Sequence, residues 1–85
     1  MEKREATVNS STGLHARPGS DLVELAMSFK SDIILEIEDK KVNSKEVLEV
    51  LTAGIGHGAK VTIIAEGEDE VEAADKIAEL INTQE

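Results

Sequence analysis

His15, Arg17 and Pro18 lie within four positions of one another in the segment GLHARPGSD, which spans residues 13–21. The segment stands where a polar stretch gives way to apolar residues at helical spacing. A helix N-terminus presents unpaired backbone N–H groups and a partial positive charge, so it attracts phosphate. If His15 caps the helix, the N–H groups of Ala16 and Arg17 lie within reach of a group bonded to its ring. The spacing therefore indicates a phosphate site.

These residue types suit phosphoryl transfer, which asks a protein mainly to position the group and to stabilise its charge. A neutral imidazole at His15 can attack phosphorus, and the guanidinium of Arg17 can hold two phosphate oxygens. Pro18 stiffens the turn and restricts the backbone of the residue before it. A histidine beside a helix start is also often no more than a capping or surface residue. Four residues alone leave both interpretations open.

No other pattern in the chain carries a recognisable reaction. The absence of cysteine excludes disulfides and thiolate metal sites. His57 is the only other histidine, and the acidic runs lack the spacing of a calcium loop. No Ser/His/Asp order comes with a nucleophile elbow. We therefore expect no metal site and no cofactor.

Length and charge limit the possible partners. With 85 residues, of which 40% are hydrophobic, the chain is expected to form one domain over residues 1–85. The net charge of -9 repels nucleic acid and anionic lipid, so neither is expected as a partner. The charge is compatible with a protein partner that has a basic face and equally with a surface that only keeps the protein soluble. The first residues lack the apolar run of a signal peptide, and no stretch approaches the ~20 apolar residues of a membrane helix. We expect a cytoplasmic monomer without membrane insertion.

Apolar spacing and turn residues predict an α+β fold with the order β-α-β-β-α-β-α. The strands are predicted over residues 2–8, 32–38, 41–43 and 60–66. The helices are predicted from Pro18 to Phe29, around residues 47–51, and from the run EGEDE to Ile81. A four-stranded antiparallel sheet with all three helices on one face would bury every helical stripe.

The same spacing predicts which helical residues face the core and which cap the helices. The core stripe of the first helix comprises Leu22, Leu25, Ala26 and Phe29, and that of the last comprises Val71, Ala74, Ile77, Ala78 and Ile81. Asn43 or Ser44 is predicted to cap the second helix, and Asp69 with Glu72 resembles a capping box. Glu72 is also expected to pair with Lys76 on the outer face of the last helix.

The sequence resembles the HPr family, the histidine-containing phosphocarrier proteins of the bacterial phosphoenolpyruvate:sugar phosphotransferase system. GLHARP matches the family's active-site signature without a gap, and KKVNSKEVLEVL resembles its second motif. IGHGAKVTIIAEGEDEVEA resembles its glycine loop, last strand and final helix. The resemblance covers essentially the whole chain and implies an open-faced sandwich of four strands and three helices.

The resemblance implies a phosphoryl carrier, not an enzyme. Phosphorylated Enzyme I would phosphorylate His15 on Nδ1, and His15 would pass the group to the IIA domains of sugar permeases. Arg17 and the N–H groups of residues 16 and 17 would hold the phosphate. Thr12 would place a hydroxyl near the imidazole.

The resemblance also implies a docking surface on the first two helices. It comprises Ser20, Val23, Met27, Val47, Leu48 and Leu51. Val23 and Met27 are i, i+4 neighbours that lie off the predicted core stripe, and exposed apolar patches commonly mark interfaces. Val23 and Val47 can equally border the core.

Three positions depart from the family pattern. His57 stands where relatives often carry a lysine or another polar loop residue, and we expect it to be solvated. Glu46 stands where many relatives carry a regulatory serine, and a glutamate cannot be phosphorylated. We favour a helix-stabilising role for Glu46, which has capping-box spacing from Asn43, over a fixed charge that lowers transfer from Enzyme I. Gly19 replaces the family's usual alanine, at a cost of ~0.5–1 kcal/mol in helix propensity.

Two other functions remain open from the sequence. A specialised or regulatory HPr-like protein would serve one dedicated phosphotransferase branch, and Glu46 and Gly19 favour it. A small-molecule-binding regulatory domain of related topology would need a ligand pocket and would not need His15.

Overall fold

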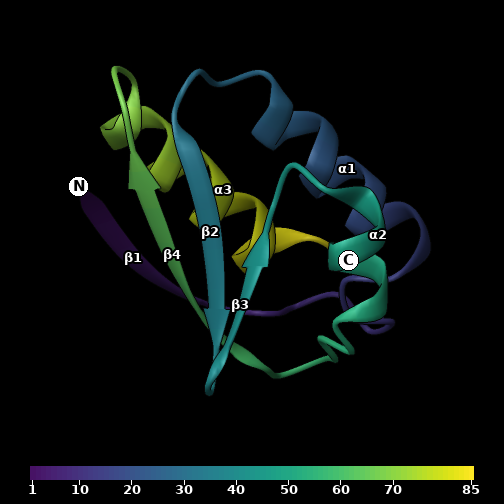
Figure 1. The fold of residues 1–85 in the computed structure, drawn as a ribbon. Coiled ribbons are helices and arrows are strands. Elements are labelled where there is room, and N and C mark those ends of the chain that lie inside the picture. The colour runs from purple at the N-terminus through teal and green to yellow at the C-terminus, as the bar shows by residue number, and fades with distance from the viewer.

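The computed structural model describes residues 1–85 and contains four strands and three helices in the predicted order (Figure 1). The strands are β1 (Glu2–Thr7), β2 (Asp32–Ile37), β3 (Lys40–Asn43) and β4 (Lys60–Glu66). The helices are α1 (Ala16–Met27), α2 (Val47–Thr52) and α3 (Glu70–Thr83). All strand pairs are antiparallel, and the sheet order is β1-β4-β2-β3. The predicted open-faced sandwich is confirmed.

Alternation along the strands places one set of side chains against the helices and the other set on the open face. The strand residues buried in the core are Ala6, Ile33, Leu35, Val42, Val61, Ile63 and Ala65. Ile34 and Ile64 are register partners in neighbouring strands, and both are only half-buried on the opposite face. With one aromatic residue in the chain, aliphatic side chains fill this core.

Helix α3 covers the sheet with a stripe that differs from the predicted one at its first turn. Its buried residues are Ala73, Ala74, Ile77, Ala78 and Ile81. Val71 is 52% exposed, so its assignment to the core was wrong. At 100° per residue Val71 lies at the edge of this stripe, where solvent reaches it. Glu72 and Lys76 are both exposed and form no ion pair.

Helix α1 begins at Ala16, two residues before Pro18, and ends at Met27. Leu22 and Ala26 are buried as predicted, whereas Leu25 and Phe29 are only half-buried. Val23, for which both the docking surface and the border of the core were left open, is 7% exposed and belongs to the core. Because α1 contacts both α2 and α3, its buried face is wider than the stripe that spacing alone predicts.

The predicted cap of α2 was wrong. Glu46 occupies the N-cap position and makes no side-chain cap hydrogen bond. The carboxamide oxygen of Asn43 accepts the Lys45 N–H and so closes the preceding turn. Ser44 is fully buried, and its hydroxyl donates to the carbonyl oxygen of Ile33. The capping-box pairing of Asn43 with Glu46 is also absent, because Glu49 is the residue whose carboxylate accepts the Asn43 N–H.

The predicted capping box of α3 was wrong as well. Asp69 is the N-cap residue, but its carboxylate turns away from the helix. It accepts hydrogen bonds from the backbone N–H groups of Lys30 and Ser31 and from the Ser31 hydroxyl. The Ser31 hydroxyl and the Lys30 N–H lower the pKa of Asp69 to about 2. Asp69 therefore ties the start of α3 to the segment between α1 and β2.

We predict that Asp69→Asn weakens the fold in a pH-dependent way. The folded-state pKa of about 2 lies below the ordinary value of 3.8, so the ionised carboxylate adds stability above pH 4. This contribution is lost as the pH falls through 2. In urea unfolding between pH 7 and pH 2, the unfolding free energies of the wild type and of Asp69→Asn should converge at low pH. The exposed control Glu72→Gln should leave the pH dependence of the unfolding free energy unchanged. A difference in unfolding free energy between Asp69→Asn and the wild type that stays constant with pH would contradict the role of the ionised Asp69 carboxylate.

Candidate functional site

His15 is the N-cap residue of α1 and has an extended backbone, with φ of -115° and ψ of 163°. Its side chain makes no cap hydrogen bond, and no other residue bonds to its ring. The residue is half-buried, so solvent reaches the imidazole. His15 thus occupies the N-cap position, the condition under which the Ala16 and Arg17 N–H groups lie within reach of a group on its ring, although the ring itself does not cap the helix. Its ring nitrogens are free to react.

Ala16 follows with φ of 51°, in the left-handed region that residues with a side chain rarely adopt. Such a conformation costs roughly 1–3 kcal/mol and persists only where the surroundings hold it. The abrupt change of backbone direction from His15 to Ala16 sets the imidazole beside the N-terminus of α1.

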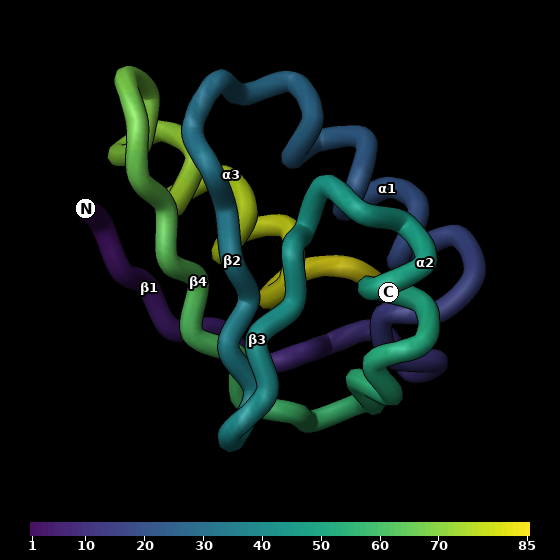
Figure 2. Tube along the Cα trace, in the orientation of Figure 1, coloured from purple at the N-terminus to yellow at the C-terminus, as the bar shows by residue number.

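The loop that carries His15 is held by the turn that follows α2, and Figure 2 shows the two segments side by side. The Leu14 N–H donates to the Ile55 carbonyl at 2.9 Å, and the Gly58 N–H donates to the Val8 carbonyl at 2.9 Å. Gly13 has φ of 74°, and a Cβ there would collide with the Ile55 carbonyl. The loop is therefore fixed by backbone contacts on both sides of Gly13.

His57, which was expected to be solvated, is exposed and also contacts this loop. Its Nδ1 lies 3.2 Å from the Ser10 carbonyl oxygen, which accepts the Gly13 N–H as well. The Ser10 hydroxyl is buried and lies 3.2 Å from the Thr12 hydroxyl. Thr12 is thus paired with Ser10 rather than with the imidazole of His15.

Arg17 projects into solvent on the outer side of the first turn. Its side chain is 90% exposed, and its Nε lies 3.8 Å from the nearer Asp21 carboxylate oxygen, at the outer limit of an ion pair. Arg17 and Thr12 line one shallow hollow of about 410 Å³, together with Ser11, Pro18, Asp21, Gln84 and Glu85. His15 lies outside that lining. The guanidinium is weakly held and retains its donors for another anion.

Of the six residues predicted for the docking surface, five are exposed or half-buried and one is buried. Met27, Val47 and Leu48 are 65%, 42% and 73% exposed, and Ser20 is exposed beside them on α1. Leu51 is half-buried. Val23 does not contribute, because it faces the core. We call Ser20, Met27, Val47, Leu48 and Leu51 the α1–α2 patch.

Gly19 brings the two helices of the α1–α2 patch together. The residue is buried, and a Cβ there would lie 2.7 Å from both the Leu14 carbonyl oxygen and the Leu51 Cδ2. An alanine at this position would require α1 to move away from these groups. Gly19 thus allows a close approach, in addition to its lower helix propensity.

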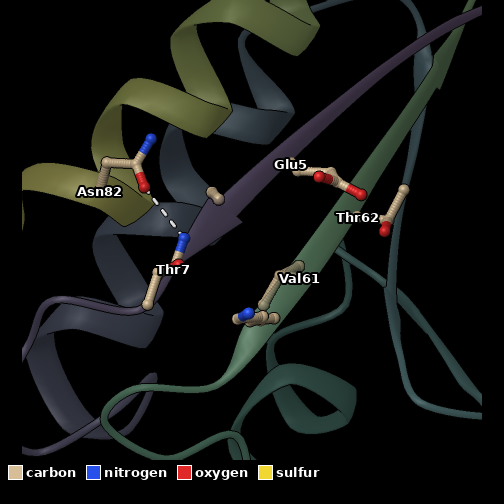
Figure 3. Close-up of a pocket in the computed structure, with 7 residues that line it drawn as sticks. Glu5, Thr7, Val61, Thr62 and Asn82 are labelled. Carbon is tan, nitrogen blue, oxygen red and sulfur yellow. Dashed lines mark hydrogen bonds between the residues drawn. The ribbon is translucent and has the colours of Figure 1, made fainter.

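A second hollow, of about 390 Å³, lies along β1, β4 and the end of α3 (Figure 3). It contains no residue of the His15 loop or of the α1–α2 patch, and its lining is mostly polar. Ligand pockets are lined mainly by apolar side chains, with few polar groups. Neither hollow has that character, so the small-molecule alternative gains no support from them.

Residues 2–83 match the family described as the PTS HPr component phosphorylation site. The chain belongs to the HPr family. Members of this family are phosphocarriers of the phosphotransferase system and not enzymes. No helix combines the length and the apolarity that a membrane crossing requires.

Solved structures of HPr proteins are closely similar to this chain. HPr-C-His from Thermoanaerobacter tengcongensis is 38% identical over 95% of this chain and 91% of its own, with a TM-score of 0.91. The phosphocarrier protein HPr from Bacillus anthracis str. Ames is 34% identical over 94% and 95%, with a TM-score of 0.90. The Bacillus subtilis catabolite repression protein Crh is 41% identical over 95% and 93%, with a TM-score of 0.75, and is described as a swapped dimer.

Glu46 is exposed at the start of α2 and forms no hydrogen bond to another side chain. Its carboxylate lies at the positive end of the helix, which is compatible with the helix-stabilising role.

The structure also shows a site residue that sequence reasoning missed. Gln84 contacts the first turn of α1 from 66 positions away, and no local motif indicates this contact.

We predict that Ala16→Gly raises the free energy of unfolding by about 0.5–1 kcal/mol, because glycine adopts the left-handed conformation without strain. Urea unfolding at pH 7 measures the change. The control Ala53→Gly, at a position with φ of -70°, should lose stability. If Ala16→Gly lowers the free energy of unfolding as much as Ala53→Gly does, the backbone of Ala16 is not strained.

Proposed function

We propose that this protein carries a phosphoryl group on His15 from phosphorylated Enzyme I to the IIA domains of sugar permeases in the bacterial cytoplasm. The single observation that carries the proposal is the free imidazole of His15 at the N-cap of α1, in a chain of the HPr family. Because no hydrogen bond within the fold occupies them, both ring nitrogens of His15 are available for such a transfer.

The residues around His15 have distinct roles in the proposed transfer. A ring nitrogen, assigned as Nδ1 from the family resemblance, attacks phosphorus while the bond between phosphorus and the donor breaks. The backbone N–H groups of Ala16 and Arg17 stabilise the phosphoryl oxygens, and the Arg17 guanidinium swings from Asp21 to neutralise their charge. The second transfer breaks the N–P bond as the IIA domain accepts the group. The carrier ends unchanged.

The α1–α2 patch supplies the docking surface for both partners. Its exposed apolar residues lie on α1 and α2, and α1 begins directly after His15. Met27 ends α1 and His15 precedes its first residue, so a partner that covers both Met27 and the imidazole extends along the whole of α1. Because a carrier meets two partners in turn, one open surface that serves both is sufficient.

We predict that His15 is the sole site of phosphoryl transfer. Incubation with Enzyme I, magnesium and phosphoenolpyruvate should add one acid-labile phosphoryl group to the wild type. His15→Ala should add none, because it lacks the nucleophile. Intact mass before and after acid treatment measures the product, and Arg17→Ala should still accept the group, but more slowly. A phosphoryl group on His15→Ala would refute the assignment.

We predict that Leu48→Ser lowers the rate of phosphoryl acceptance about tenfold, as expected when an interface residue worth about 1.4 kcal/mol is lost. Leu48 is 73% exposed, so the unfolding free energy should hardly change. Val71→Ser is the matched control, because Val71 is also exposed but lies on α3. Equal rates for both variants would place the docking surface elsewhere.

A regulatory HPr-like role is the second candidate, since the 41% identical Crh carries catabolite repression in its name and Glu46 replaces the usual serine. This role predicts little or no transfer from Enzyme I to the wild type. Glu46→Ser would then test whether the fixed charge is responsible. The expectation of a monomer also remains a prediction, because Crh is described as a swapped dimer. Sedimentation of the wild type would decide it.

A further inference from the structure

Gln84 connects the end of α3 to the first turn of α1. It is the C-cap residue of α3, and its backbone N–H donates to the Leu80 carbonyl. Its side-chain Nε2 donates to the Pro18 carbonyl at 2.9 Å. In Figures 1 and 2 the yellow end of the chain runs toward the blue segment where α1 begins.

The orientation of the Gln84 carboxamide follows from its partner. The Pro18 carbonyl can only accept, so the group that faces it must be the NH₂. The opposite atom, Oε1, is then buried without any hydrogen-bond partner, and it is the one buried side-chain polar atom of the chain in this condition. A buried polar atom without a hydrogen-bond partner lowers the stability of the fold. Within the protein, the Gln84 side chain therefore makes its one hydrogen bond to the first turn of α1.

Gln84 also holds the other end of the reactive loop. Its carbonyl oxygen accepts the Asn9 side-chain amide at 2.8 Å. Asn9 stands near the beginning of the loop that carries His15, and Pro18 stands just after its end. One residue of α3 therefore spans the loop, from Asn9 on one side of His15 to Pro18 on the other.

The first turn of α1 needs such a support. The hydrogen bond from the Gly19 N–H to the His15 carbonyl is long, at 3.5 Å, and Ala16 is held in the left-handed region. The only side-chain hydrogen bond that reaches this turn from another element is the one from Gln84. Without it, the Ala16 and Arg17 N–H groups would lose a fixed direction relative to the imidazole.

We propose that Gln84 is a positioning residue for His15, which holds the first turn of α1 through the Pro18 carbonyl so that the Ala16 and Arg17 N–H groups face the phosphoryl group. The inference rests on the proposed phosphocarrier function. Gln84 touches neither the reacting nitrogen nor the α1–α2 patch. It acts on the transfer step and leaves docking unchanged.

Gln84→Met tests the proposal, because methionine keeps the length of the side chain and removes the donor. The rate of His15 phosphorylation at saturating carrier should fall about fivefold, the factor expected for one neutral hydrogen bond. The carrier concentration that half-saturates Enzyme I should stay unchanged. The free energy of unfolding should change little, since removal of the unpaired oxygen offsets the lost hydrogen bond to Pro18. Gln84→Ala, which places no new group beside Pro18, should be phosphorylated as slowly as Gln84→Met.

Asn82→Leu is the matched control. Asn82 stands on the same turn of α3, and its Oδ1 accepts the Thr7 N–H at 2.9 Å, as drawn in Figure 3. This variant also removes one bond from a side chain to the backbone, but the bond leads to β1. Its phosphorylation rate should equal that of the wild type. Amide ¹H–¹⁵N shifts of Ala16 and Arg17 in the unphosphorylated proteins should move in Gln84→Met and not in Asn82→Leu.

The outcomes separate the two proposals. If the wild type accepts phosphate and Gln84→Met matches it in rate and in the Ala16 and Arg17 shifts, the positioning role is overturned and the carrier function stands. An equal loss of rate in Asn82→Leu would also overturn it, because the effect would then be one of general stability. If the wild type accepts no phosphate from Enzyme I, both proposals fail.

Discussion

The left-handed backbone of Ala16 is the constraint on which the rest of the site depends. It turns the chain sharply between an extended His15 and the first turn of α1. An alanine holds this conformation only if its neighbours are fixed. Leu14 provides one anchor, since it is completely buried and its N–H is bonded to the Ile55 carbonyl. The strained residue and its anchors together set the imidazole at the helix end.

The site is open to solvent, which suits the proposed carrier function. The imidazole of His15 and the guanidinium of Arg17 both reach solvent, and neither is tied firmly to the fold. The hydrogen bonds that hold the site are made mainly by the loop backbone, to the turn after α2 and to Gln84. A fixed backbone with free side chains suits a group that is received and given away, because the same donors serve both transfers.

Local patterns predicted the order of elements, the strands and the position of His15, because each depends on neighbours in the chain. The alternation in β4 and the approach of Pro18 to a helix start are examples. Predictions failed where a distant group competes for a side chain. Asp69 has the spacing of a cap, yet Ser31 and the Lys30 N–H take its carboxylate. Ser44 likewise bonds to the Ile33 carbonyl instead of capping α2.

The sequence by itself determined which residues are able to react, since an imidazole, a guanidinium and a helix start are properties of residue types and their spacing. Only the tertiary structure decided how they are held. Val23 is buried because α1 meets two other helices, and Thr12 pairs with Ser10 rather than with the ring. The support from Gln84 joins residues 66 positions apart. Spacing along a chain cannot encode such a contact, because it arises only when the sheet brings α3 and α1 together.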